Sequence, residues 1–225
     1  TAVFVKVEAP DWAVKATRRL YQEDTEADRF YKYVILAKAA VEYVERFVRW
    51  ERVKHLDLQE AYTVLALFFK RHPRARLVIH TPAPWGHPAF HRRFFRDEFG
   101  FEMAMEPVVL TELGLAMAAE GVVVSKKMVK LTCNTFPHHC HKIKPVTNAV
   151  EIPRWEHPKV AGVKSPEELK KTREAVKEEA LKVLGVEAGG KVVLSWARRL
   201  THYKRPHFVL QLIEDLNRDV VFLLG

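Results

Sequence analysis

The sequence is poor in cysteine, and it lacks any long hydrophobic run. Its two cysteines, Cys133 and Cys140, are too few for the disulfide framework of a small secreted protein. No apolar segment approaches the length that crosses a bilayer, and the N-terminal residues lack the basic and then apolar layout of a signal peptide. We therefore expect a cytoplasmic protein without a membrane partner.

The sequence also lacks a basic and aromatic strand of the kind that binds RNA, so its net positive charge is not accompanied by a nucleic-acid-binding motif. The 225 residues carry a net charge of +9, with 37 lysines and arginines beside 28 acidic residues. Because both signs are interspersed, largely on predicted helix faces, we interpret the excess as solvated surface and expect no nucleic-acid partner. Asparagine and glutamine occur only three times each, which is typical of a thermophilic source.

What the sequence does contain is an alternation of strand-like and helix-like segments. Short apolar or β-branched runs predict strands at Thr1–Glu8, Leu77–Ile79, Val122–Val124, Ile143–Val146, Val192–Leu194 and Asp219–Leu224. Apolar residues at helical spacing predict helices from a cap at Thr25 to near Trp50, and over Leu58–Lys70, Ala89–Phe99, Val108–Ala119, Pro166–Leu184 and Pro206–Leu216. This alternation predicts the α/β class with largely parallel sheets.

Two predicted helices begin with a capping signal. Asp57 and Glu60 stand in the order of a capping box before Leu58–Lys70, so Glu60 is interpreted as a helix cap rather than a catalytic acid. Ser165 and Glu168 have the same spacing and enclose Pro166, which suits a first helical position.

The segment most like a domain boundary is Glu151–Lys164, which contains two prolines between regular elements. We expect residues 1–150 to form the late part of a first Rossmann-like domain and residues 151–190 to form a linker and a connecting helix. Residues 191–225 would then begin a second Rossmann-like domain. Because so small a second domain would be marginal alone, we expect the chain to belong to a longer protein.

A group of cations follows the predicted strand Val192–Leu194. Arg198, Arg199 and Lys204 lie between this strand and the helix that Pro206 begins. Ligands bind at the carboxyl ends of strands in open α/β sheets, and a helix N-terminus favours an anion. The pattern predicts a phosphate site at Arg199 and Lys204, with Arg198 in a structural or peripheral role. The alternative is a solvated basic loop.

Four segments, in order along the chain, resemble the α-glucan phosphorylases, which act on glycogen, starch and maltodextrin. They are RRLYQED (18–24), IHTPAPWGH (79–87), VTNAVEIPRW (146–155) and WARRLTHYKR (196–205). The resemblance implies a GT-B fold, in which two Rossmann-like domains face each other across a catalytic cleft. Both domains would be incomplete in this chain.

The resemblance also implies roles for five residues. Arg199 and Lys204 would bind the phosphate, with Tyr203 beside it on the sugar side, while His80 would hydrogen-bond the glucosyl unit and Asn148 would contact the same sugar. His80, Arg199 and Lys204 would be catalytic. The implied reaction is reversible phosphorolysis of an α-1,4-glucan to glucose 1-phosphate with retention. The pyridoxal phosphate of the family would be held by a lysine outside this chain.

Other interpretations stay open. Asp57 and Gln59 resemble the His-Asp-Trp-Gln segment of glycogen and starch synthases, and Ala149 replaces a glycine of phosphorylases. A synthase would use a nucleotide glucose and would need no pyridoxal phosphate. A third possibility is a non-catalytic fragment that binds glucan or a partner. His80 also fits a satisfied histidine at a strand end, Asn148 also fits a turn, and assembly into a homo-oligomer stays open.

The residues Cys133, His138, His139, Cys140 and His141 form a cluster of potential metal ligands. Their spacing is not one of the regular paired cysteine or histidine spacings of zinc sites. We therefore expect a basic surface loop there rather than a metal site.

Overall fold

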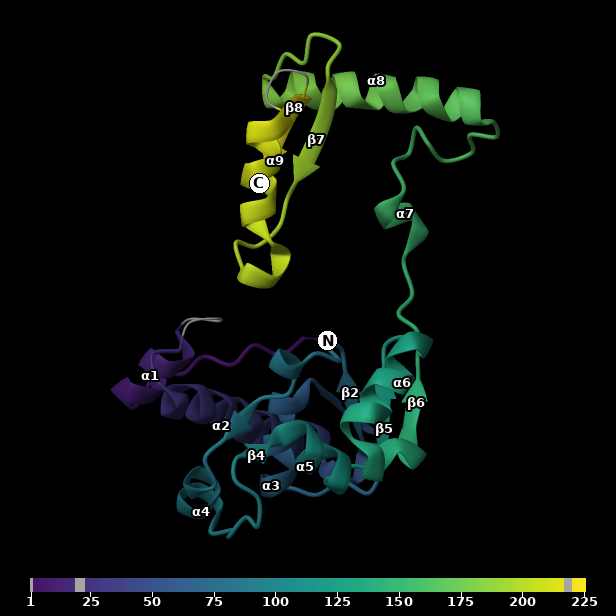
Figure 1. Ribbon diagram of the computed structural model, residues 1–225. Helices are drawn as coiled ribbons and strands as arrows, with labels where there is room; N and C mark the ends of the chain where they lie inside the picture. Colours follow the sequence, from purple (N-terminus) through teal and green to yellow (C-terminus); the bar gives the residue numbers. More distant parts are fainter. Residues whose placement is uncertain (1, 19–22, 217–219) are drawn as a thin grey trace. The chain divides into compact units, whose positions relative to one another are not determined.

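The structure is a computed structural model that describes residues 2–18, 23–216 and 220–225 (Figure 1). The chain divides into two compact units, Thr1–Ala149 and Val150–Gly225, each of which is described below by itself. The first unit contains a four-stranded sheet and the second a two-stranded sheet, and both are parallel. The predicted α/β class is confirmed, and the four-stranded sheet is compatible with a Rossmann-like fold.

The sheet of the first unit has the order β1-β2-β5-β6. Its strands are β1 (Leu56–Gln59), β2 (Ala75–Ile79), β5 (Glu120–Val123) and β6 (Ile143–Pro145). All neighbouring strands run parallel, with Leu58 opposite Leu77 and Leu77 opposite Gly121. The carboxyl ends of the four strands therefore meet at one edge of the sheet, where the chain leaves each strand for a loop or helix.

Helices and single turns precede the first strand of this sheet and connect the later ones. They are α1 (Asp11–Thr17), α2 (Glu26–Tyr43), η1 (Val44–Val48), η2 (Trp50–Arg52), η3 (Ala61–Leu65), α3 (Ala66–Phe69), η4 (Pro84–Gly86), α4 (Arg93–Phe99), α5 (Leu110–Met117), α6 (Lys126–Thr135) and η5 (Pro137–Lys142). The predicted cap of α2 is confirmed, because the Asp28 backbone N–H donates to Thr25 Oγ1 at 3.0 Å. A two-stranded antiparallel sheet, β3 (Ala89–Phe90) with β4 (Val108–Val109), precedes α5.

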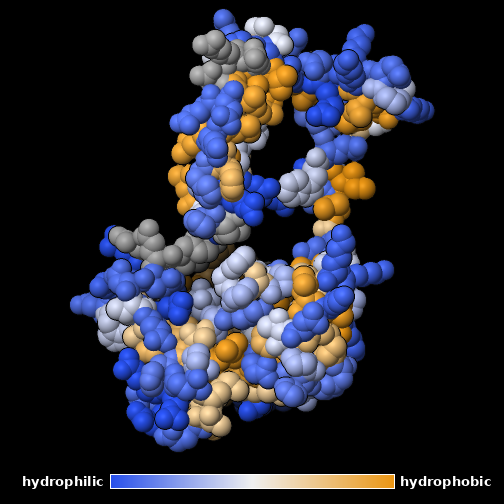
Figure 2. All heavy atoms as spheres, viewed as in Figure 1, coloured by the Kyte–Doolittle hydropathy of each residue, from blue (hydrophilic) through white to orange (hydrophobic). Residues whose placement is uncertain are grey.

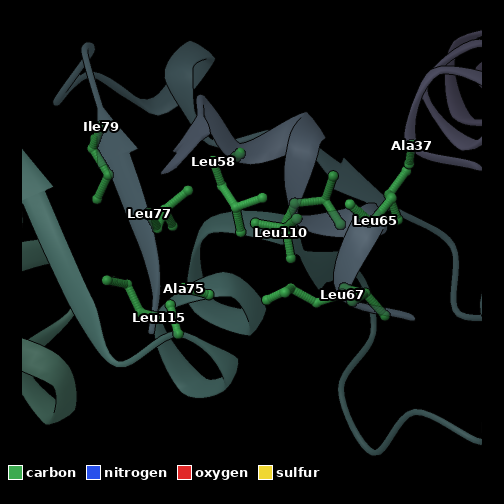
Figure 3. Close-up of a cluster of buried hydrophobic side chains, with 14 of the residues drawn as sticks. Ala37, Leu58, Leu65, Leu67, Ala75, Leu77, Ile79, Leu110 and Leu115 are labelled. Atoms are coloured by element: carbon green, nitrogen blue, oxygen red, sulfur yellow. The ribbon is translucent and has the colours of Figure 1, made fainter. Parts of the chain in front are cut away.

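One face of the sheet forms the core of the first unit. Figure 3 shows Leu58 of β1, Leu77 of β2 and Leu110 of α5 directed into the same buried layer. Phe30 of α2 is fully buried, with its ring centroid 5.2 Å from those of Phe90 and Phe94. Burying these apolar side chains is the main favourable contribution to folding.

The other face of the sheet is more polar and is partly accessible to solvent. Along β2, Arg76 and Val78 are half-buried, whereas Ala75, Leu77 and Ile79 are buried. Neighbouring side chains on this face form two ion pairs, Asp57 with Arg76 and Glu120 with Lys144. The alternation along each strand thus separates a core face from a polar face that carries functional groups.

Two element predictions in the first unit are wrong, and two predicted helices are confirmed with later starts. Residues 2–8 form no strand, because their alternating pattern finds no neighbouring strand to pair with. The predicted helix Leu58–Lys70 is replaced by β1, η3 and α3, because Leu56–Gln59 pairs with β2. The helices predicted from Ala89 and Val108 begin later, at Arg93 and Leu110, because the residues before them pair as β3 and β4.

The second unit contains α7 (Ile152–Trp155), α8 (Pro166–Leu184), β7 (Val192–Trp196), η6 (His202–Lys204), α9 (Pro206–Leu216) and β8 (Val220–Leu224). The predicted cap of α8 is confirmed: Ser165 Oγ accepts from the Glu168 backbone N–H at 3.1 Å. The β-loop-α-β unit is confirmed as well, with Val192 opposite Val220 in the parallel pair β7–β8; Asp219 lies outside the described residues.

Hydrophobic residues lie at the surface of the second unit, as Figure 2 shows in orange. They include Phe208 and Leu210 of α9 and Val192 of β7, which are 53%, 60% and 60% exposed. Among the residues that the structure describes, none of the helices has both the length and the apolar character needed to cross a membrane.

The packing at Gly114 of α5 gives a test of the core. A Cβ atom there would overlap Val64 Cγ2 and lie 2.8 Å from Leu77 Cδ2. In an exposed helix Gly→Ala stabilises by about 1 kcal/mol, but overpacking a core costs about 1–3 kcal/mol. We expect Gly114→Ala to lower the free energy of unfolding in urea, whereas Ala116→Ser, on the exposed side of α5, should change it little. A more stable Gly114→Ala protein would contradict this packing.

Candidate functional site

The carboxyl edge of the four-stranded sheet carries a pair of polar side chains from neighbouring strands. Gln59 is the last residue of β1, and His80 directly follows β2. The parallel register places Gln59 opposite Val78, two residues before His80, so that Gln59 and His80 lie on the same face. Gln59 Oε1 and His80 Nε2 are 2.8 Å apart, which is hydrogen-bond distance.

A cavity of about 280 Å³ opens beside this pair. It is lined by side chains of the polar face of the sheet and of the segment that follows β6: Asp57, Gln59, Arg76, Val78, His80, Val122, Val124, Val146 and Asn148. Asn148 is held by its backbone N–H, which donates to the Val124 carbonyl at 3.1 Å. The structure thus brings together His80 and Asn148, two of the residues for which the resemblance to phosphorylases implies sugar binding.

Asp57 and Arg76 form the charged end of the cavity. Arg76 Nε and Nη2 donate to the two carboxylate oxygens of Asp57 at 2.5 and 2.8 Å. These hydrogen bonds lower the pKa of Asp57 below its ordinary value of 3.8, more strongly than partial burial raises it, and the charge of Arg76 acts in the same direction. Asp57 is therefore an ion-paired carboxylate at neutral pH, and it caps no helix.

Glu60, the residue after β1, is strained, and its predicted role as a helix cap is wrong. No side-chain cap hydrogen bond is formed, and its backbone has φ 70° and ψ 158°, a region that residues other than glycine seldom adopt. Burial raises the pKa of the Glu60 carboxyl, while the charge of His80 and a hydrogen bond with the His80 backbone lower it. Sequence reasoning missed this residue as part of the site, because the capping-box spacing offered a local explanation.

The loop after His80 is fixed by side-chain contacts within the first unit. His87 Nδ1 lies 3.0 Å from Thr111 Oγ1 of α5, and the His87 and Phe136 rings meet edge to face. Burial lowers the pKa of His87 below its ordinary value of 6.5, although the Pro82 carbonyl opposes this effect. His87 therefore favours the neutral form, and its role here is to hold the loop.

The basic loop of the second unit lies where the sequence predicts it, between the carboxyl end of β7 and the first turn of α9. The Arg198 backbone N–H donates to the Gly225 carbonyl at 3.2 Å, and the Lys204 backbone N–H donates to the Thr201 carbonyl at 3.0 Å. Arg199 is exposed and Lys204 is half-buried. The side chain of Tyr203 lies outside what the structure describes, as do residues 19–22 of the RRLYQED segment.

Arg198 differs from Arg199 and Lys204 in its surroundings. It lines a mainly apolar cavity of about 400 Å³ with Trp196, Leu200, Pro206, Val209, Leu210, Leu224 and Gly225. Arg199 and Lys204 do not line this cavity.

The cluster of cysteines and histidines contains a disulfide that the sequence argument did not predict. Cys133 of α6 is bonded to Cys140 of η5, with the two Cα atoms 4.8 Å apart. His139 Nε2 lies 2.9 Å from Glu112 Oε1 of α5. Within residues 2–18, 23–216 and 220–225, no three histidine, cysteine or acidic side chains are grouped to hold a metal ion.

Each site suits a different chemistry. The cavity at the sheet edge offers imidazole, amide and carboxylate groups, which hydrogen-bond hydroxyl-rich ligands, and the basic loop offers cations for an anion. Compared with known proteins, the chain matches no family model and no curated protein. Function is therefore inferred from the residues of these two sites.

The Asp57–Arg76 pair predicts a pH dependence of stability. Because the pKa of Asp57 is lowered on folding, its contribution to stability is present above the unfolded value and is lost as pH falls through the lowered pKa. We expect Asp57→Asn to have a lower free energy of unfolding in urea than the unmodified protein near neutral pH. We expect this difference in unfolding free energy to narrow below pH 3.8. The control is Glu102→Gln, an exposed loop change, which should show no such difference. A difference that widens in acid would contradict the assignment.

Proposed function

We propose that the protein is a retaining α-1,4-glucan glycosyltransferase of the phosphorylase type, which converts glycogen or maltodextrin and phosphate to glucose 1-phosphate. The observation that carries this proposal is the basic loop with Arg199 and Lys204, at the end of β7 and before α9. Its sequence resembles the phosphate-binding loop of α-glucan phosphorylases. The proposal includes the GT-B arrangement of two Rossmann-like domains.

Two physical features make this loop suited to phosphate. Helix α9 begins at Pro206, and the helix dipole favours negative charge at its first turn, where the Phe208 backbone N–H donates to the Arg205 carbonyl at 3.1 Å. Arginine binds phosphate through a planar fork of N–H donors, and lysine adds a second positive charge. Arg199 and Lys204 would neutralise the phosphate and stabilise the charge that develops as the glycosidic bond breaks.

The cavity of the first unit would bind the glucosyl group. His80 and Asn148 line it together and offer an imidazole and an amide to sugar hydroxyls. In the reaction the glycosidic bond breaks, a phosphate oxygen bonds to the anomeric carbon, and the glycosidic oxygen that leaves takes up a proton. The pyridoxal phosphate implied by the resemblance would bind to a lysine outside this chain, so we assign none of the described residues to it.

A second candidate function is supported by the lining of the cavity. Asp57 and Gln59, which resemble the His-Asp-Trp-Gln segment of glycogen and starch synthases, lie in the same cavity as His80. Their placement favours a role in binding rather than the start of a helix. In a synthase, Arg199 and Lys204 would bind the diphosphate of a nucleotide glucose, and the protein would extend a glucan without pyridoxal phosphate.

One set of assays separates these functions. The full-length protein is incubated with maltoheptaose and inorganic phosphate, and glucose 1-phosphate is measured. Formation of glucose 1-phosphate supports the phosphorylase, whereas extension of the glucan only with a nucleotide glucose supports the synthase. Retention on immobilised glucan with neither reaction would favour a non-catalytic glucan-binding protein.

The basic loop offers a matched pair of variants. We expect Arg199→Ala to lower turnover by about a hundredfold or more, because one strong contact to the transferring phosphate is lost. Arg198→Ala, the neighbouring change, should lower turnover far less, because Arg198 lines the apolar cavity and its backbone contact to Gly225 is unchanged. Near-normal turnover of Arg199→Ala under saturating phosphate would contradict the proposed phosphate site.

A further inference from the structure

The contact between Gln59 and His80 bears on which ring nitrogen of His80 carries the proton. Gln59 Oε1, which lies 2.8 Å from His80 Nε2, is a carbonyl oxygen and can only accept. With the Gln59 amide in this orientation, His80 Nε2 carries a hydrogen and donates it to Oε1. In the neutral ring the other nitrogen, Nδ1, then has a lone pair and no hydrogen.

We propose that Gln59 is a positioning residue that holds His80 as the Nε2–H tautomer, so that Nδ1 accepts a hydrogen bond from a ligand hydroxyl in the cavity. That this hydroxyl belongs to a sugar rests on the proposed function, whereas the tautomer does not. In this tautomer the neutral ring accepts from the ligand, because its one N–H donates to Gln59.

The residues around the pair hold Gln59 in place. The Glu60 backbone N–H donates to the Val78 carbonyl at 3.0 Å, and Thr63 Oγ1 donates to the Glu60 carbonyl at 2.8 Å. Glu60 keeps its strained backbone between these contacts, and such strain persists only where the surroundings fix it. The corner that follows β1 is thus fixed from both sides, and Gln59 is the residue immediately before it.

Other polar groups of the cavity have different partners. Both oxygens of Asp57 accept from Arg76, so this ion pair is already made across β1 and β2. Asn148 comes from the segment after β6, where its backbone is bonded to Val124. Gln59 is therefore the side chain that the strand register aligns with the His80 ring.

In this tautomer the His80 ring distinguishes ligands by whether they can donate a hydrogen bond to Nδ1. A hydroxyl can donate to Nδ1, whereas an ether or fluoro substituent at the same position has no hydrogen to donate. The pair would thus favour a free sugar hydroxyl over a substituted one. Gln59 would contribute to this selection without touching the reacting atoms.

The tautomer can be measured directly in the full-length protein without any substrate. Long-range ¹H–¹⁵N NMR of the imidazoles, with the signals of His80 assigned by their loss in His80→Gln, distinguishes a protonated Nε2 from a protonated Nδ1. We expect protonated Nε2 in the neutral ring, a shift toward the other tautomer in Gln59→Leu, and no shift in Gln59→Glu, whose carboxylate also only accepts. Gln211→Leu, an exposed change on α9, is the control.

A kinetic readout tests the consequence for the ligand. Loss of one such hydrogen bond corresponds to about a threefold to tenfold weaker interaction. We expect Gln59→Leu to raise KM for maltoheptaose by roughly this factor with a smaller effect on kcat, and Gln59→Glu to restore KM.

The two readouts separate the failure of this inference from the failure of the proposed function. A protonated Nδ1 in the unmodified protein, or a tautomer that Gln59→Leu leaves unchanged, would overturn the positioning role of Gln59. An unchanged KM in Gln59→Leu with an altered tautomer would overturn the ligand contact. If the unmodified protein neither forms glucose 1-phosphate nor extends a glucan, the proposed function fails, and the NMR result still decides the tautomer.

Discussion

The parallel pairing of β1 with β2 is the constraint on which the first unit depends. It buries Leu58 and Leu77 on one face and leaves Asp57 and Gln59 on the other. A shift of one residue would move both polar side chains into the core and expose Leu58, which burial strongly disfavours. The hydrophobic core thus sets the register, and the register sets which groups reach the cavity.

A conflict between local and tertiary preferences explains the strained corner after β1. The spacing of Asp57 and Glu60 favours a helix start, but Leu56–Gln59 pairs with β2 instead and buries Leu58. Glu60 is therefore the residue that directly follows the strand. The result is a glutamate in a backbone region that glycine usually occupies. Such a local cost is tolerated when the rest of the fold fixes the segment, and here it lies directly beside the candidate sugar-binding histidine.

The two candidate sites differ in how much tertiary structure they need. The basic loop of the second unit lies within one β-loop-α-β unit, so strand, cations and helix are neighbours in the sequence. The cavity of the first unit is assembled from β1, β2 and β5 and from the residues that follow β2, β5 and β6, which are far apart along the chain. Only the basic loop of the second unit therefore has a compact sequence pattern.

The sequence by itself determined the features that depend on near neighbours. The caps at Thr25 and Ser165 follow from short-range spacing, because their hydrogen bonds join residues three apart. The parallel β7–α9–β8 unit follows from three consecutive segments with clear strand and helix patterns, although its pairing joins Val192 to Val220. Only the tertiary structure decided that Leu56–Gln59 is a strand and that Asp57, Gln59, His80 and Asn148 share a cavity. The physical reason is that strand pairing and burial join residues distant in sequence, and no local pattern records which partner a segment will meet.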